Sequence, residues 1–162
     1  MKKFFFFGLL MLSILGYFAC IKSGPTDPVC TPMPVASDSA ALLQFAGDSI
    51  KLTKEIHGLY YHIIDSGKSD PSYHPVFSSN VTVTYIAKLM DHRTIDSAVS
   101  TNLGGAALYK LIPAWQIALP KIGVGGRIQI FAPSALAYGC TGYQTIPANS
   151  PLYFDVKLIS FY

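Results

Sequence analysis

The last third of the chain alternates strand-forming segments with one short helical segment, and this order restricts the fold more than any other feature. Residues 127–132 and 152–161 are rich in β-branched and aromatic residues, so both predict strands. Pro113 stands where it can open a helix that contains Trp115. Pro120 should stop or kink that helix. We therefore expect a short helix packed beside strands that precede and follow it.

The middle of the chain adds further strands. Residues 59–64 and 81–87 predict two strands, and the Pro- and Ser-rich residues 69–80 predict the loop between them. Residues 108–112 predict a short extended segment. The whole order predicts an α+β fold, in which an antiparallel sheet wraps around one short central helix and the helices lie on one face.

Several short segments then stand in a familiar order and spacing. They are Leu111-Ile112-Pro113-Ala114-Trp115, Val124-Gly125-Gly126-Arg127, Ala137-Tyr138-Gly139 and residues 146–156. Upstream, residues 81–85 are followed by Ile95-Asp96-Ser97. With these segments the chain resembles the FKBP-type peptidyl-prolyl cis/trans isomerases from about Gly58 to Phe161. The resemblance implies an FKBP-like fold, rotation of X-Pro bonds as the activity, proline-containing polypeptides as substrates and no cofactor.

The resemblance also implies a pocket for a proline ring. Trp115 would form its floor, while the backbone N–H of Ile112 and the hydroxyl of Tyr138 would donate hydrogen bonds to substrate carbonyls. Asp96 would lie at the rim, and Ile146 would cover the site. The catalytic residues implied are Tyr85, Asp96, Ile112, Trp115 and Tyr138, and the substrate-binding residues implied are Ile95, Leu111, Ile146 and Phe154.

Two observations bear on this assignment: a structural alternative for four of the residues, and departures from the family that indicate reduced activity. Periodicity alone assigns Tyr85, Ile112, Trp115 and Phe154 to the core, because apolar residues of strands and helices are usually buried there. In addition, Ile95 stands where the family has phenylalanine, and residues 101–107 lack the aromatic residue that the family often has there. We therefore expect either an isomerase of reduced or restricted activity or a noncatalytic binding module of an envelope assembly.

The N-terminus predicts export. Lys2 and Lys3 precede the uncharged apolar stretch from Phe4 to Ala19, as in a signal peptide spanning residues 1–19. Ala19 followed by Cys20 is similar to the processing site of a bacterial lipoprotein, which implies lipidation of Cys20 and attachment to a membrane of the cell envelope. Ordinary secretion and an uncleaved anchor are the alternatives.

Three further segments follow the leader. Residues 20–36 contain four prolines and few large apolar residues, so they predict a flexible tether. Residues 37–57 predict a helical extension, capped by Ser37 or Ser39 and stopped by Gly47. Residues 58–162 predict the isomerase domain. The length of the chain after the predicted leader fits one domain with its own core, and we expect a monomer.

Charge and composition exclude other classes of function. Without Lys2 and Lys3 of the leader, ten basic and nine acidic side chains remain, which gives no electrostatic surface for nucleic acid. The four histidines have no spacing typical of a metal site. The remaining cysteines, Cys30 and Cys140, either form a disulfide or stay free thiols, since spacing alone does not decide between them.

Overall fold

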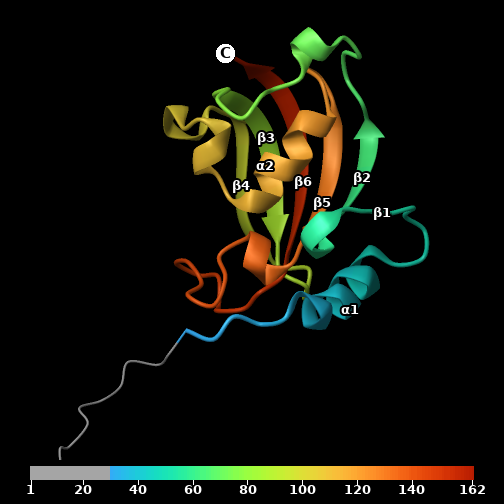
Figure 1. Ribbon diagram of the computed structural model, residues 1–162, viewed down its shortest axis with the longest axis vertical. Coiled ribbons are helices and arrows are strands. Elements are labelled where there is room, and N and C mark those ends of the chain that lie inside the picture. Colours follow the sequence, from blue (N-terminus) through green and yellow to red (C-terminus); the bar gives the residue numbers. More distant parts are fainter. Residues whose placement is uncertain (1–29) are drawn as a thin grey trace, which may run out of the picture.

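The computed structural model describes residues 30–162, so the predicted signal peptide and Cys20 lie outside the described residues. Its largest element is a six-stranded sheet, in which every pair of neighbouring strands is antiparallel. In order across the sheet the strands are β1 (Thr53–Lys54), β2 (Tyr60–Asp65), β5 (Arg127–Ala132), β6 (Leu152–Phe161), β3 (Val81–Lys88) and β4 (Thr94–Thr101). Figure 1 shows this sheet behind the short helix α2 (Pro113–Ala118).

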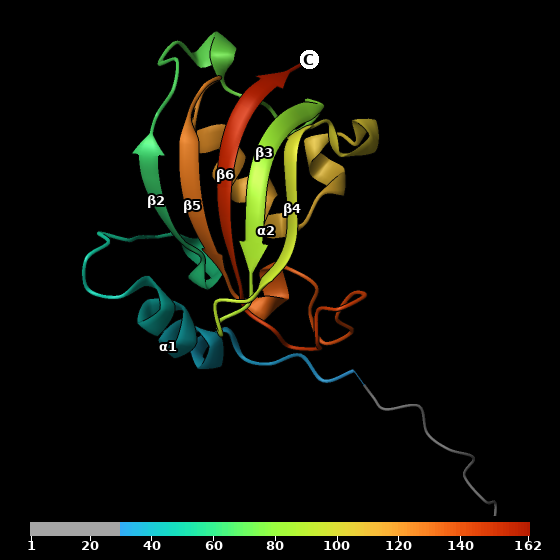
Figure 2. The same ribbon diagram turned by 180° about the vertical axis from the view of Figure 1, so that it is seen from behind.

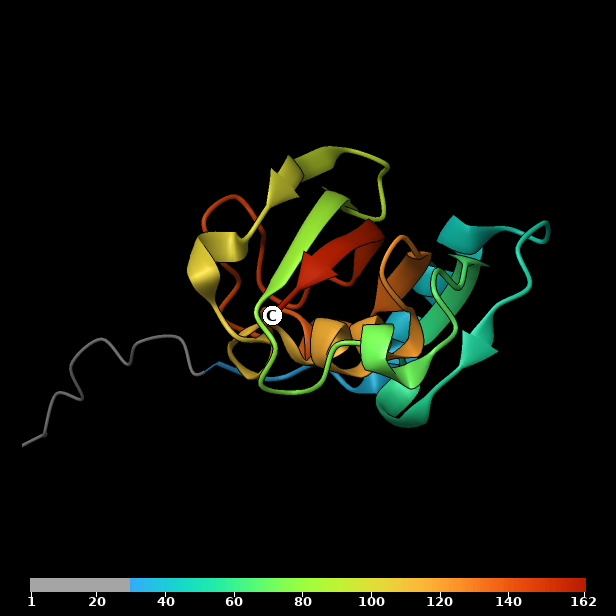
Figure 3. The ribbon, with the colours of Figure 1, turned by 90° about the horizontal axis from the view of Figure 1, so that it is seen from above.

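The main core lies between α2 and one face of the sheet (Figure 3). Alternate residues of the central strands, such as Ile130 and Val156, turn inward and are fully buried. Ala114 and Ala118 allow α2 to lie close to these strands, and both are fully buried. Each large aliphatic side chain removed from water here contributes roughly 2 kcal/mol. The central strands therefore fix the position of α2, and with it the position of Trp115.

The other α-helix, α1 (Val35–Ala46), packs on the opposite face of the sheet near one of its ends, as the rear view in Figure 2 shows. Tyr60, Phe131 and Tyr153 stand side by side on β2, β5 and β6, and Leu42 of α1 packs against this row. The prediction that the helices lie on one face is therefore wrong for α1. The aromatic row explains the difference, because it gives the outer face an apolar patch that α1 covers.

The observed boundaries of α1 agree with the prediction at its C-terminal end but not at its N-terminal end. Gly47 ends α1 as predicted, and its N–H donates to the carbonyl of Leu43. However, α1 begins at Val35 after Pro34, so neither Ser37 nor Ser39 is its N-cap. Ser39 lies within the helix and donates to the carbonyl of Val35. No helix in the described part of the chain is both long and apolar enough to cross a bilayer.

Short 3-10 turns connect the main elements. They are η1 (Ile56–Gly58), η2 (Pro71–Tyr73), η3 (Leu103–Gly105), η4 (Leu108–Lys110), η5 (Leu119–Lys121) and η6 (Ser134–Leu136). The extended segment predicted over residues 108–112 is wrong for its first three residues, which form η4. Leu111 and Ile112 are extended as predicted. For Ile112 the reason is Pro113, which disfavours helical geometry in the residue before it. Pro120 lies in η5, where α2 tightens and ends.

Candidate proline-binding site

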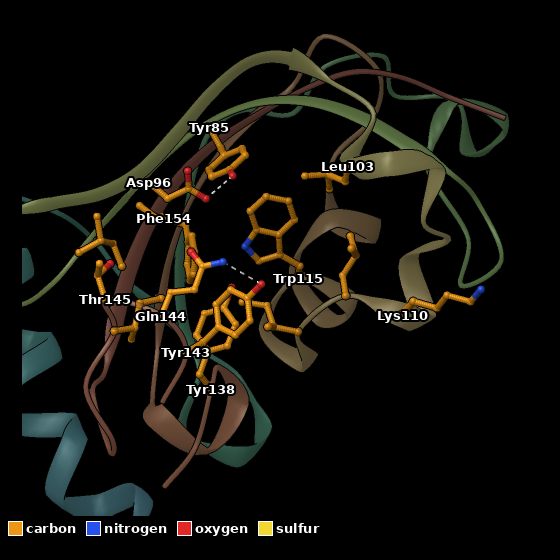
Figure 4. Close-up of a pocket in the computed structure, with 15 residues that line it drawn as sticks. Tyr85, Asp96, Leu103, Lys110, Trp115, Tyr138, Tyr143, Gln144, Thr145 and Phe154 are labelled. Atoms are coloured by element: carbon orange, nitrogen blue, oxygen red, sulfur yellow. Dashed lines mark hydrogen bonds between the residues drawn. The ribbon is translucent and has the colours of Figure 1, made fainter. Parts of the chain in front are cut away.

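A cavity of about 490 Å³ lies beside α2, between β3, β4, β6 and the loop after η6 (Figure 4). The resemblance predicted nine pocket residues from five separate parts of the chain, and the fold brings all nine to the lining of this cavity. They are Tyr85, Ile95, Asp96, Leu111, Ile112, Trp115, Tyr138, Ile146 and Phe154. Their individual roles stay predictions, whereas their assembly on one cavity is a property of the structure.

Trp115 forms the base of the cavity and is only 5% exposed. The rings of Tyr85 and Phe154 stand nearly perpendicular to its indole, with centroids at 5.2 and 5.7 Å. Edge-to-face packing of this kind stabilises each aromatic pair by roughly 1 kcal/mol beyond the area that it buries. The indole N–H, which is buried, has no acceptor among residues 30–162. The three rings together give the cavity an aromatic base, as Figure 4 shows.

Tyr85 and Asp96 meet across neighbouring strands. The Tyr85 hydroxyl on β3 donates to Oδ2 of Asp96 on β4, at 2.5 Å. Burial raises the pKa of the Tyr85 hydroxyl, and the hydrogen bond to Asp96 raises it further. The phenol therefore keeps its proton at neutral pH and holds one carboxylate oxygen of Asp96 at the rim. The second oxygen of this exposed carboxylate stays available to a ligand.

The far wall is a stacked pair of tyrosines from the loop after η6. Tyr138 and Tyr143 lie nearly parallel, with ring centroids 5.2 Å apart. Gln144 donates to the hydroxyl of Tyr143 at 3.1 Å, whereas the Tyr138 hydroxyl makes no hydrogen bond within the described chain. Burial raises the pKa of the Tyr138 hydroxyl, and Asp96 adds to the rise. Tyr138 is thus a protonated, unengaged donor facing the cavity.

A second free donor comes from the backbone. Ile112 is the N-cap residue of α2, and its N–H has no acceptor among the described residues. A half-buried backbone N–H normally finds a partner, so an unpaired one at the edge of a cavity is available to a ligand carbonyl. Besides the indole N–H at its aromatic base, the cavity therefore has two unpaired donors at its edge, the Tyr138 hydroxyl and the Ile112 N–H. It holds no nucleophile paired with a base.

The loop that carries Tyr138, Tyr143 and Ile146 is fastened at several points. Tyr143 and Ile146 exchange backbone hydrogen bonds of 3.0 and 2.8 Å. A disulfide joins Cys140 to Cys30, which decides the alternative left open by the sequence. Asn149 accepts from Met33 N–H and donates to the Thr31 carbonyl, both at 3.1 Å. The segment 30–33, predicted as part of a flexible tether, is therefore bound to the cavity loop.

Sequence reasoning missed several lining residues. Leu103 lies in the segment 101–107, where the lack of an aromatic residue was noted, and it supplies an aliphatic wall. Tyr143 contributes a ring from the opposite side, and Gln144 and Thr145 follow it along the rim. The only signal for Tyr143 was its place five residues after Tyr138 in a glycine-containing loop. Leu103 therefore gives one wall an aliphatic side chain, and Tyr143 gives another wall a ring that was not predicted.

Sequence comparison relates the chain to proteins of known family. A sequence model of the family described as FKBP-type peptidyl-prolyl cis-trans isomerase matches residues 73–159. FkpA of Escherichia coli strain K12, an FKBP-type peptidyl-prolyl cis-trans isomerase, is 37% identical over 105 residues, which cover 63% of this chain and 37% of the relative. The matched region thus spans little more than a third of the length of that curated relative.

Solved structures show the same fold. The crystal structure of FkpA from Escherichia coli matches with a TM-score of 0.65 and 30% identity, covering 79% of this chain and 59% of the other. A peptidyl-prolyl cis-trans isomerase from Pseudomonas syringae pv. tomato matches with a TM-score of 0.63 and 25% identity, covering 81% and 98%. The predicted FKBP-like fold is confirmed. The chain belongs to the FKBP-type peptidyl-prolyl cis-trans isomerase family.

Proposed function

We propose that this protein accelerates cis/trans rotation of X-Pro bonds in exported polypeptides. The observation that carries the proposal is the cavity itself, with Trp115 at its base and two unpaired hydrogen-bond donors, Ile112 N–H and Tyr138 O–H, at its edge. A proline ring fits an apolar, aromatic surface, and the carbonyls that flank the proline require donors. No cofactor is needed for this reaction.

The physical chemistry of the reaction matches such a cavity. Rotation about the X-Pro bond meets a barrier of about 20 kcal/mol, because the twisted amide loses its resonance. The twisted amide is less dipolar than the planar one, so a dry aromatic cavity stabilises it relative to the ground state. Hydrogen bonds from Ile112 N–H and Tyr138 O–H would hold the flanking carbonyls in the turn that suits the twisted amide. Asp96 would engage polar groups of the chain at the rim.

The enzymatic role is tested with the full chain, purified in detergent, in a proline-peptide isomerisation assay. We expect Tyr138→Phe to lower kcat/KM about fivefold, the value of one neutral hydrogen bond. Tyr73→Phe is the control, because Tyr73 is exposed and lies outside the cavity lining. A folded wild-type chain without rate enhancement would overturn the proposal. Binding of proline peptides by such an inactive chain would identify a noncatalytic binding module instead.

We also place the protein in the cell envelope of a bacterium, attached to the membrane through lipid on Cys20. The sequence features of residues 1–20 support this location, and a disulfide between Cys30 and Cys140 suits an oxidising compartment. Cys30 is fixed to the domain and follows Cys20 by ten residues, which span at most about 35 Å when fully extended. The domain would therefore act on chains close to the membrane surface.

Lipidation has its own experiment. We expect Cys20→Ser to abolish labelling of the protein by a radioactive fatty acid in bacterial cells, because the thiol of Cys20 is the acceptor. The double variant Cys30→Ser/Cys140→Ser serves as control and should remain labelled. Undiminished labelling of the Cys20 variant would contradict the anchor.

A further inference from the structure

The peptide bond between Leu111 and Ile112 lies at the cavity, and the side chains of both residues line it. Its N–H belongs to Ile112 and has no acceptor in the described chain. Pro113 restricts Ile112 to its extended backbone conformation, with φ −59° and ψ 145°. The direction of the N–H depends on the ψ of Leu111 and the φ of Ile112, the two rotations that turn this peptide plane.

Gln116 of α2 holds that plane from the other side. Its Nε2 donates to the carbonyl of Leu111 at 2.7 Å and to the carbonyl of Tyr109 at 3.1 Å. A side-chain amide nitrogen has two hydrogens, so both are used. Gln116 also follows Ile112 by one helical turn, and its own N–H donates to the Ile112 carbonyl. Gln116, a residue of α2, thus holds the segment from η4 to α2 through hydrogen bonds to three of its carbonyls.

The geometry of a trans peptide connects these contacts with the free donor. The C=O and N–H of one peptide point in opposite directions. Because Gln116 holds the Leu111 carbonyl, the N–H of the same peptide must point away from Gln116. A hydrogen bond accepted by the carbonyl also polarises the peptide, which makes its N–H a stronger donor.

We infer that Gln116 is a positioning residue, which fixes the Leu111–Ile112 peptide so that the Ile112 N–H is aimed at a carbonyl of the bound polypeptide. Gln116 is not among the residues that line the cavity, so its effect on a bound polypeptide would pass through this peptide. The inference rests on the proposed isomerase function for its catalytic consequence. Its structural part, the fixed peptide plane, is independent of turnover.

Two variants test the inference in the full chain, purified in detergent. Gln116→Leu removes both donors at similar size, and Gln116→Glu replaces them with a carboxylate that repels the two carbonyls. Gln129→Leu is the matched control, because Gln129 is also half-buried and also donates through Nε2, to the Tyr153 hydroxyl on the outer face of the sheet. Each Gln116 variant loses two side-chain hydrogen bonds and Gln129→Leu loses one, but only the Gln116 variants disturb the Leu111–Ile112 peptide.

We expect kcat/KM to fall about fivefold in both Gln116 variants and to stay at the wild-type value in Gln129→Leu. Urea unfolding should show that all three variants remain folded, with a larger loss of stability in Gln116→Leu, which breaks two hydrogen bonds, than in Gln129→Leu, which breaks one. Amide ¹⁵N relaxation dispersion should show microsecond-to-millisecond exchange at Ile112 in the Gln116 variants, and none there in the wild type or the control.

Wild-type relaxation of the Ile112 amide in both Gln116 variants would overturn the inference. Exchange at Ile112 with unchanged kcat/KM would also overturn it, because orientation of the donor would then have no effect on the reaction. An inactive wild-type chain would overturn the proposed function instead, and the relaxation data alone would then decide whether Gln116 fixes the peptide.

Discussion

Replacement of both Cys30 and Cys140 by serine is expected to lower the free energy of unfolding by about 3 to 4 kcal/mol. The disulfide connects residues 110 positions apart, so it closes a loop that contains most of the domain. In the chain-entropy account, a cross-link over a loop of this length greatly restricts the unfolded chain, and its removal stabilises the unfolded state. Urea unfolding followed by circular dichroism measures the difference.

The same variant should also raise KM for a proline peptide. Cys140 follows Tyr138 by two residues, and the disulfide holds the loop that lines one side of the cavity. The wild type treated with a reductant is the control, and it should reproduce both effects. A double variant with the stability and KM of the wild type would show that the hydrogen bonds of Asn149 suffice to hold this loop.

Asp38→Leu is expected to cost about 3 kcal/mol of stability. Asp38 is only 2% exposed, and its Oδ2 accepts from the backbone N–H and from the hydroxyl of Ser134, both at 2.7 Å. Pro133, the N-cap residue of η6, has no side-chain acceptor for the N–H groups at the start of that turn. Asp38 of α1 provides the acceptor instead. Leucine would leave two buried donors unsatisfied, each at a cost of roughly 1 to 3 kcal/mol.

Two comparisons make the Asp38 experiment specific. Asp38→Asn keeps an acceptor oxygen, so its cost should be much smaller than that of Asp38→Leu. Asp48→Leu is the control for an exposed acidic residue just beyond α1, and surface changes of this kind stay within about 0.5 kcal/mol. Equal stability of Asp38→Leu and Asp48→Leu in thermal and urea unfolding would contradict the capping role of Asp38.

Strands with an apolar inner face could be predicted from the sequence almost to the residue. β5 and β6 have the predicted bounds, because the alternation of their buried residues is strong. β4 was not predicted as a strand. It is an edge strand without a fully buried residue, and its Thr and Ser side chains give little apolar pattern. The Ile95-Asp96-Ser97 segment was instead recognised through its resemblance to the family.

Long-range polar contacts could not be predicted. Asp38 accepts hydrogen bonds from Ser134, and Asn149 is hydrogen-bonded to the segment 30–33. Both contacts join residues far apart in the sequence, so no local sequence pattern predicts them. The cavity residues were found because their order transfers from the family, whereas Tyr143 and Gln144 lie in a loop whose path depends on a disulfide. Gln116 shows the same limit, since one of its two acceptors, the Tyr109 carbonyl, lies in the turn η4, which was predicted to be extended.

The order of the strands also bears on how the chain reaches this fold. β6 pairs with β5 on one side and with β3 on the other, so within the sheet it alone joins the β1–β2–β5 half to the β3–β4 half. Among the six strands of this sheet, β6 comes last in the sequence, so it is synthesised after the other five. Until then each half presents an unpaired edge, which is a site for aggregation. A chain that ends before Leu152 would therefore contain nearly all of the cavity residues and yet could not assemble the cavity.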